Sequence, residues 1–183
     1  MPWAARAGSR YAGPIERHSI QAIIGALNAH QVRYLVAGGL AVVAHGHVRF
    51  TADLDLILDL EQDNVTRAIT ALAGLGYGPR APVELGQFAD VAARATWVRE
   101  KGMTVFSLFS PEHAATEIDL FVEPPLDFER AYAAAVAMHV APQTVARFVS
   151  FDDLIAMKER AGRPQDAQDI ERLRALRQER DDE

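Results

Sequence analysis

The chain has 183 residues, of which 49% are hydrophobic and 24% are charged, and its formal net charge is −6. The length suits one compact domain, and the composition is that of an ordinary globular protein rather than a disordered chain. The lack of cysteine excludes disulfides and thiolate metal sites, and the negative charge disfavours a broad nucleic-acid-binding surface.

Three parts are expected along the chain. Residues 1–14 have no continuous apolar stretch, so we interpret them as a flexible arm and not as a signal peptide. Residues 15–149 are expected to form the core, and residues 150–183 a helical segment packed on it. No stretch is apolar enough over the length of a membrane span, so no membrane partner is expected. Together with the lack of cysteine, this favours a cytoplasmic protein.

The first half of the core alternates between helical and strand patterns. Acids alternate with aliphatic residues over 52–60, which is typical of a half-buried strand with one acidic face. Asn64 is a fair N-cap for the helix that follows. The expected elements are a helix over 15–29, a strand over 33–37, a short helix over 40–44, a strand over 52–60 and a helix over 64–75.

The second half begins with a loop and contains three β-like runs, the first two joined by a turn at Lys101-Gly102. Ser150 is a predicted N-cap, and Gly162 to Pro164 break the helix that it starts. The expected elements are a loop over 74–82, β-like runs over 93–99, 104–109 and 116–122, a helix over 127–138, a strand over 144–149, a helix over 151–160, a helix from residue 165 and a frayed tail over 177–183. This order predicts an α+β (α/β-like) fold, with a mixed β-sheet flanked by helices.

The segment most informative about chemistry is Gly38-Gly39, followed by thirteen residues and then Asp53-Leu54-Asp55. Two glycines after a strand let the backbone come close to a ligand, and the helix after them points free N–H groups at an anion, which suits a triphosphate. Asp53 and Asp55 are two apart on a strand, so both side chains project from one face.

Side-by-side carboxylates repel each other, and a divalent cation removes that penalty. Magnesium suits few protein oxygens plus water and phosphate, and manganese is the alternative metal. Asp119 supplies a third acid on another predicted strand, with Glu117 on the same face as its competitor. Three such carboxylates would hold two metals roughly 3.5–4 Å apart, an arrangement suited to phosphoryl-type transfer. Asp59, at the end of the first acidic strand, is expected to be solvent-exposed.

Several other polar residues allow two interpretations, one functional and one structural. Arg49 and Thr51 lie just before the acid pair and would reach phosphate or ribose, or Arg49 would simply pair with the acids. His45 and His47 are better explained as loop or helix-end residues than as metal ligands. The C-terminal arginines would form either an RNA-facing patch or an ion-paired surface. These arginines are Arg160, Arg163, Arg172, Arg174 and Arg177.

The pattern GG-x13-D-L-D with a later strand acid resembles the signature of the polymerase-beta type of nucleotidyltransferase fold. The text GGLAVVAHGHVRFTADLDL is similar to the opening motif of small bacterial proteins related to AbiEii-type toxins. The text LIAMKERAGRPQDAQDIERL resembles their later motifs, a lysine followed by Ala, Arg and Asp residues. These matches extend from Val36 to Leu173.

The resemblance implies a nucleotidyltransferase fold and a role for each matched residue. Gly38 and Gly39 would contact the triphosphate, and Lys158 would match a lysine that contacts the nucleotide phosphates and takes part in catalysis. The acid of the last motif would be Asp166 or Asp169, and both stay open. The catalytic, metal-binding carboxylates would be Asp53, Asp55 and Asp119.

The function that follows is magnesium-dependent transfer of a nucleoside monophosphate from a nucleoside triphosphate to a hydroxyl group, with release of pyrophosphate. Kinship with AbiEii relatives implies tRNA as the acceptor and a toxin–antitoxin role with a cognate partner. An aminoglycoside adenylyltransferase and a protein-modifying adenylyltransferase are alternatives on the same chemistry. A non-catalytic nucleotide-binding or antitoxin module is an alternative of another class, and a dimeric regulatory protein without nucleotide is a third.

Overall fold

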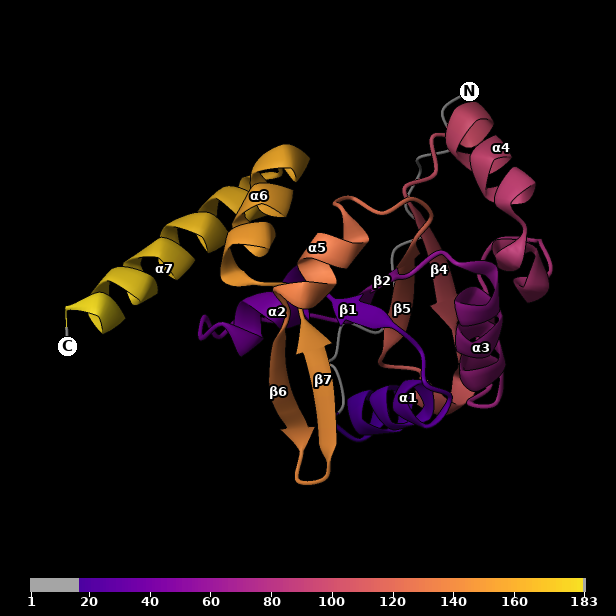
Figure 1. The fold of residues 1–183 in the computed structure, drawn as a ribbon, viewed down its shortest axis with the longest axis horizontal. Helices are drawn as coiled ribbons and strands as arrows, with labels where there is room; N and C mark the ends of the chain where they lie inside the picture. The colour runs from indigo at the N-terminus through magenta and orange to yellow at the C-terminus, as the bar shows by residue number, and fades with distance from the viewer. Residues whose placement is uncertain (1–16, 183) are drawn as a thin grey trace.

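The computed structural model of the protein describes residues 17–182, so the expected flexible arm over 1–14 lies outside the described residues. Helices and strands alternate along the chain (Figure 1). The α-helices are α1 (Arg17–Ala29), α2 (Gly38–Ala44), α3 (Gln62–Ala73), α4 (Val91–Lys101), α5 (Phe128–Ala133), α6 (Phe151–Ala161) and α7 (Pro164–Asp181). The strands are β1 (Tyr34–Val36), β2 (Asp53–Leu58), β3 (Gly78–Pro79), β4 (Val105–Phe109), β5 (Glu117–Phe121), β6 (Val136–Ala141) and β7 (Thr144–Phe148), and two short 3₁₀ helices are η1 (Leu85–Ala89) and η2 (Pro111–His113).

The strands form one seven-stranded sheet in the order β3-β4-β5-β2-β1-β7-β6. The pairs β2–β5 and β1–β7 are parallel, and the other neighbouring pairs are antiparallel. The expected α+β fold around one mixed sheet flanked by helices is therefore confirmed. The sheet order places β2 and β5, which carry the sequence-predicted acids, next to each other at its centre.

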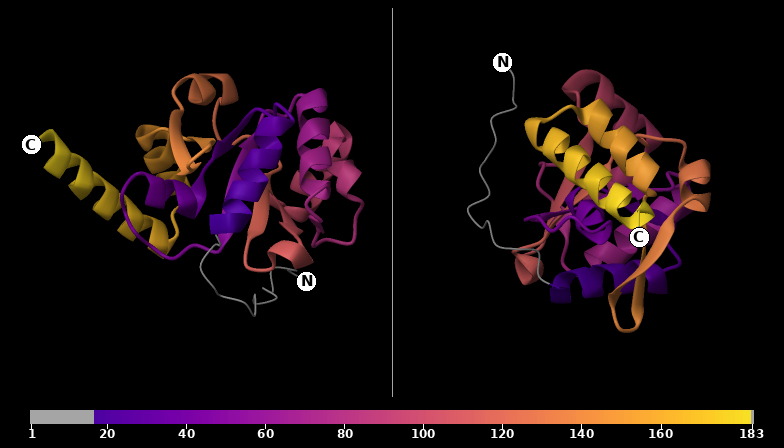
Figure 2. Two further views of the ribbon diagram at one scale, coloured as in Figure 1. Left: turned by 90° about the horizontal axis from the view of Figure 1, so that it is seen from below. Right: turned by 90° about the vertical axis from the view of Figure 1, so that its left-hand side faces the viewer.

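Helices α1 and α3 pack against each other and cover one face of the sheet (Figures 1 and 2). On α1, Ile23, Ile24 and Leu27 are fully buried, as the helical spacing of its apolar residues predicts. On β2, Leu54 and Leu56 are equally buried in the same core. Because side chains alternate along a strand, burial of these leucines directs the intervening aspartates to the opposite face of the sheet.

The C-terminal helices form a separate layer. Helix α6 contacts α2, and α7 packs on α6 and extends away from the sheet (Figures 1 and 2). The expected cap of α6 is confirmed, since the Ser150 hydroxyl accepts from the Asp153 N–H at 3.2 Å. Gly162 ends the helix with φ of +62°, a left-handed conformation that glycine adopts without strain. Within residues 17–182, no helix combines the length and apolar character needed to cross a membrane.

Two expected elements are wrong in type. Residues 93–99 form no strand but lie in α4, where the Asp90 side chain accepts from the Ala92 N–H and the left-handed Gly102 ends the helix. Lys101-Gly102 is therefore a helix end and not a hairpin turn. The expected helix over 127–138 ends at Ala133, because the residues after it pair with β7 as β6. Pairing with a distant strand outweighs the local alanine-rich composition there.

Three smaller expectations are also wrong. The N-cap of α3 is Glu61, whose side chain accepts from the Asn64 N–H at 3.1 Å. Asn64 is instead buried and joins α3 to β1, since its side chain accepts from the Arg33 N–H at 2.8 Å and donates to the Arg33 carbonyl at 3.0 Å. Asp59 is only 18% exposed and accepts a bond from the Arg33 guanidinium at 2.6 Å. The tail expected to fray continues as helix up to Asp181.

Candidate active site

Two carboxylates meet at the centre of the sheet. Asp55 of β2 lies directly opposite Asp119 of β5 in the parallel register, and Asp53 lies opposite Glu117. All four side chains project from the face opposite the core, because their strand neighbours are buried in the core. Asp55 and Asp119 are partly buried, whereas Asp53 is exposed at the start of β2. The structure therefore brings Asp55 and Asp119 together and leaves Asp53 at the rim.

The glycine pair is packed tightly against this acidic strand. The backbone N–H of Ala37 donates to the carbonyl of Asp55 at 2.9 Å, which ties the start of α2 to β2. A Cβ on Gly38 would lie 1.8 Å from Asp55 Oδ2, and Gly38 has φ of +59°. A Cβ on Gly39 would lie 2.4 Å from Thr51 Oγ1. Both positions therefore exclude a side chain so that the α2 backbone can lie against the carboxylate.

Burial and mutual repulsion disfavour the charged forms of these acids. Burial, reinforced by the charges of Asp119 and Asp53, raises the pKa of Asp55 from 3.8 to about 7, while the nearby Arg163 charge and a backbone bond from Gly39 only partly oppose this. Burial also raises the pKa of Asp119 against the opposing effect of a hydrogen bond from Ser107. Burial and the charge of Asp119 raise the pKa of Asp53 as well. The site thus favours a bound cation or proton.

Two residues outside the sequence-predicted set hold the acids in place. Ser107 of β4, opposite Asp119 in register, donates its hydroxyl to Asp119 Oδ1 at 2.5 Å. Arg80 forms a bidentate pair with Glu117, with one bond of 2.7 Å. Glu117, the competitor for the role of third acid, is therefore neutralised by an arginine, whereas Asp119 keeps one oxygen available. Neither partner was predicted, because each comes from a distant segment that the strand pairing alone brings close.

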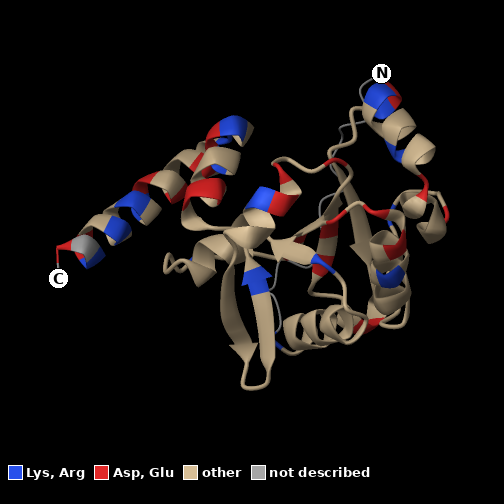
Figure 3. Cartoon of the chain, viewed as in Figure 1, with Lys and Arg blue, Asp and Glu red and all other residues tan. Residues whose placement is uncertain are grey.

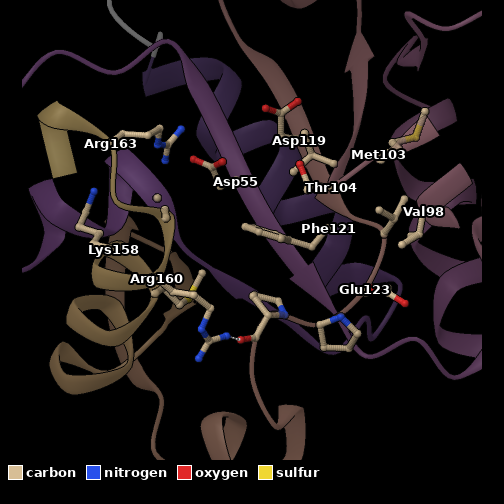
Figure 4. Close-up of a pocket in the computed structure, with 18 of the residues that line it drawn as sticks. Asp55, Val98, Met103, Thr104, Asp119, Phe121, Glu123, Lys158, Arg160 and Arg163 are labelled. Carbon is tan, nitrogen blue, oxygen red and sulfur yellow. Dashed lines mark hydrogen bonds between the residues drawn. The ribbon is translucent and has the colours of Figure 1, made fainter. Parts of the chain in front are cut away.

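A cavity of about 650 Å³ opens beside the acid pair. Figure 4 shows Asp55 and Asp119 projecting into it from adjacent strands, with Arg163 and Lys158 on one side and Val98 and Met103 on the other. Gly38 also lines this cavity. Of the sequence-predicted site residues, Gly38, Asp55, Asp119 and Lys158 line the cavity, and Gly39, Arg49, Thr51, Asp53, Asp166 and Asp169 do not. The volume is within the range of small-molecule sites.

Lys158 lies at the centre of a buried ionic group, which we call the Lys158 cluster and define as Lys158, Asp166, Asp169, Arg49 and Arg163. The Lys158 ammonium donates to Asp166 Oδ1 at 2.9 Å and to Asp169 Oδ2 at 2.7 Å. Arg49 donates to Asp169 at 2.5 Å, and Arg163 donates to Asp166 at 2.8 Å. Three cations face two carboxylates, so the cluster keeps a net positive charge beside the acid pair.

The structure places both Asp166 and Asp169, the two acids that the motif match leaves open, inside the Lys158 cluster. Each is only 2% exposed, and neither lines the cavity. Burial acts to raise the pKa of Asp166, but bonds from Lys158 and Arg163 outweigh it and hold the pKa below its usual range. These carboxylates therefore bind cations of the cluster in the described structure, rather than facing a ligand.

The residues of the loop between α2 and β2 join the site to the C-terminal helices. Arg49 pairs with Asp169 and not with the acids of β2, so the expectation that it pairs with those acids is wrong. Thr51 packs against Gly39 and donates to the Asp53 carbonyl at 3.3 Å. The ring of His45 bonds to the Val149 carbonyl at 2.9 Å, as expected of a helix-end histidine and not of a metal ligand.

The acid pair has the donor chemistry that magnesium prefers. Asp55 and Asp119 offer hard oxygen ligands opposite each other on neighbouring strands, and burial first, with neighbouring carboxylates second, raises the pKa of both. Across residues 17–182, no three His, Asp or Glu side chains already stand at a spacing that would enclose a metal ion. The residues fit a magnesium ion that arrives with the phosphates of a nucleotide and takes its remaining ligands from phosphate and water.

Comparison with known proteins identifies the fold. No protein-family profile and no curated relative matches the sequence. A lincosamide antibiotic adenylyltransferase, LnuA, solved with lincomycin bound, is similar with a TM-score of 0.56 and 14% identity over 90% of this chain and 99% of that one. An antigenic nucleotidyltransferase-like protein from Paracoccidioides brasiliensis is similar with a TM-score of 0.54 and 14% identity, over 88% and 76% of the chains. The protein therefore has the nucleotidyltransferase fold. The AbiEii-type relationship stays a prediction.

Proposed function

We propose that the protein transfers a nucleoside monophosphate from a nucleoside triphosphate to a hydroxyl group and releases pyrophosphate. The observation that carries the proposal is the pairing of Asp55 with Asp119, in register on adjacent parallel strands, at the wall of a cavity bordered by Gly38 and the Lys158 cluster. Burial and neighbouring charges raise the pKa of both acids, so a bound cation would relieve the strain of their ionised forms, and a net positive cluster beside them suits the phosphates that bring one. Both fold neighbours carry the name nucleotidyltransferase or adenylyltransferase, which supports the same chemistry.

In this proposal each group of the chain has a stated task, and Asp119 has two alternative ones. Gly38 brings the α2 backbone against Asp55, so that the phosphates can approach the acid pair closely. Asp55 and Asp119, with Asp53 at the rim, would hold magnesium or manganese, which when bound neutralises the carboxylates and polarises the α-phosphate. Arg163 is 73% exposed and next to Asp55, so it is the member of the cluster that can turn toward phosphate oxygens without leaving a buried site.

The bond changes define what Asp119 must do. The acceptor oxygen forms a new bond to the α-phosphorus, the bond from that phosphorus to the bridging oxygen of the β-phosphate breaks, and pyrophosphate leaves. The acceptor hydroxyl must lose its proton in this step. Asp119 would either complete the metal site or take this proton, because Ser107 fixes one of its oxygens at 2.5 Å and leaves the other available.

We propose a positioning task for Lys158 beside the phosphate contact that the motif match implies. Its ammonium already donates to two buried carboxylates, so it joins α6 to α7 and positions Arg163 and Arg49 through them. Its contact with phosphate would replace one of those bonds. The tRNA acceptor and the toxin–antitoxin partner stay part of the hypothesis that the AbiEii resemblance supplies.

The test has a binding arm and a transfer arm. Each nucleoside triphosphate with magnesium is added to the protein, and the melting temperature is measured; binding at a hundred times Kd would stabilise the fold by about 2.7 kcal/mol. Each α-labelled triphosphate is then incubated with acceptor pools, using wild type, Asp55→Asn and the control Asp59→Asn, which changes the same charge on an ion-paired residue outside the cavity. We expect transfer that is lost only in Asp55→Asn. If no triphosphate shifts the melting temperature and no label is transferred, the proposal is wrong.

A further inference from the structure

The cavity beside the acid pair has two chemically different ends, separated by the acids. The sheet order places β1, and with it Gly38, on one side of Asp55, and β4 on the far side of Asp119. The end beside Gly38 carries Lys158 and Arg163 and suits phosphates. The end beyond Asp119 is lined by apolar side chains from the end of α4 and from β5 (Figure 4).

We propose that this second end, formed by Val98, Met103 and Phe121, is the acceptor subsite, and that it binds a small hydroxyl compound with an apolar body. The inference rests on the proposed transfer function and names its substrate class. A nucleotide with its phosphates at Gly38 reaches the acids from one side. The acceptor hydroxyl that receives the nucleoside monophosphate must therefore reach them from the other side. The apolar end is the part of the cavity in that position.

The spacing along β5 supports this assignment. Phe121 is two residues after Asp119, so its ring projects from the same face about 6–7 Å further along the strand. If the apolar body of an acceptor packs on the Phe121 ring, a hydroxyl about 6–7 Å away would lie at Asp119. A few covalent bonds span this distance, so the subsite fits a compact acceptor whose hydroxyl is attached directly to its apolar body.

The opposite wall of the subsite is fixed by a helix cap. Gly102 adopts the left-handed conformation, with φ of +58°, and its N–H bonds to the Val98 carbonyl at 3.0 Å. The Met103 N–H bonds to the Trp97 carbonyl at 3.2 Å, and Trp97 is itself buried in the core. Val98 and Met103 are therefore held at the cavity by the backbone of α4, so the subsite is preformed.

The charges around the cavity disfavour both polyanionic and polycationic acceptors. The Lys158 cluster sets three cations against two carboxylates, so its net positive charge is small and suits the phosphates of one nucleotide rather than the long phosphate backbone of tRNA. The arginines of α7 lie mainly in its second half (Figure 3), and two of them are paired, since Arg174 donates to Glu159 and Arg177 donates to Asp152. At the apolar end, the acid that lines the cavity is Glu123, which suits one ammonium group rather than the several of an aminoglycoside.

The experiment measures transfer of label from each α-labelled triphosphate that the protein binds. The probes are lincomycin and chloramphenicol as compact amphiphilic hydroxyl compounds, kanamycin as a polycation, and total tRNA. The variant Val98→Trp fills the subsite, and its control is Val91→Trp on the same helix, where the side chain is 63% exposed and outside the cavity. Met103→Gln makes the subsite polar with little change in size, and it replaces Val98→Trp if that protein does not fold.

We expect label in an amphiphilic compound, reduced at least tenfold by Val98→Trp or Met103→Gln but not by Val91→Trp, with nucleotide-induced stabilisation unchanged in all three variants. Label in kanamycin or tRNA and in neither amphiphile would overturn this inference and leave the proposed transferase function standing. If wild type and both subsite variants label an amphiphile equally, the acceptor does not bind at Val98, Met103 and Phe121, and this inference is wrong. Absence of nucleotide binding, or of label in every pool, would overturn the proposed function and this inference with it.

Discussion

Replacing Asp55 by asparagine should stabilise the metal-free protein at neutral and alkaline pH. Burial and two neighbouring carboxylates raise the pKa of Asp55 from 3.8 to about 7. Between these values the folded protein holds a proton that the unfolded chain has released. The stability that this group supplies is therefore fully present below about pH 4 and is lost as pH rises through about 7. Asparagine has nearly the same shape and cannot ionise, so the Asp55→Asn protein does not lose stability through this group as the pH rises.

The magnitude follows from the pKa difference. The pKa of Asp55 rises from 3.8 to about 7, and each pKa unit corresponds to about 1.4 kcal/mol, so wild type loses at most about 4 kcal/mol of its free energy of unfolding when Asp55 ionises. Asp53 and Asp119 share the excess charge and also titrate upward, so we expect about half of that ceiling. For a chain of this size, about 2 kcal/mol corresponds to a rise in melting temperature of roughly 4–8 °C.

The assay is thermal unfolding of both proteins in EDTA across the pH range from about 4 to about 8. The melting temperatures should coincide at the acid end and diverge with increasing pH, with Asp55→Asn the more stable. Asp59→Asn is the control, since Asp59 accepts a bond from Arg33 at 2.6 Å and its replacement should lower stability. Magnesium with a bound triphosphate should then stabilise wild type only. A difference that is absent at alkaline pH, or that does not change with pH, would refute the reasoning about the acid pair.

Three further predictions concern the groups around the acids. Gly38→Ala should lower the free energy of unfolding, measured by urea denaturation, by at least about 2 kcal/mol, because the new Cβ would lie 1.8 Å from Asp55 Oδ2 at a positive φ. The control Gly25→Ala, with open space around it in α1, should be neutral or stabilising. Lys158→Met should lower the free energy of unfolding in urea by about 3–5 kcal/mol, because it leaves two buried carboxylates without their shared cation. Lys101→Met, at the exposed end of α4, should lower it little, and equal effects of the two substitutions would contradict the burial of Lys158. Arg80→Met should raise the pKa of Asp119 further, because the arginine charge lowers it now; carboxyl titration by NMR checks this, and an unchanged pKa would show that the two groups are uncoupled.

Local chemistry made much of the fold predictable. The alternation around Asp53 and Asp55 follows from the two-residue period of a strand, and it correctly placed both acids on β2. Ser150 and Gly162 correctly marked the limits of α6, because a cap depends on a few neighbouring residues. The same local reasoning failed over 93–99, where β-branched and aromatic residues suggested a strand and the caps at Asp90 and Gly102 produce α4.

The amino-acid sequence by itself determined which residues are candidates for the chemistry, because the two glycines, the acids and the lysine stand out by residue type and spacing. The tertiary structure alone decided their partners. Asp119 meets Asp55 only because β5 pairs in parallel with β2, and Ser107 meets Asp119 only because β4 pairs with β5. Lys158 binds Asp166 and Asp169 inside a packed helix pair rather than facing the cavity alone. The apolar end of the cavity is likewise assembled from α4 and β5, which are distant in sequence. The physical reason is that residue type and period are local properties of the chain, whereas strand register, burial and the pKa shifts that follow from them depend on contacts between distant segments.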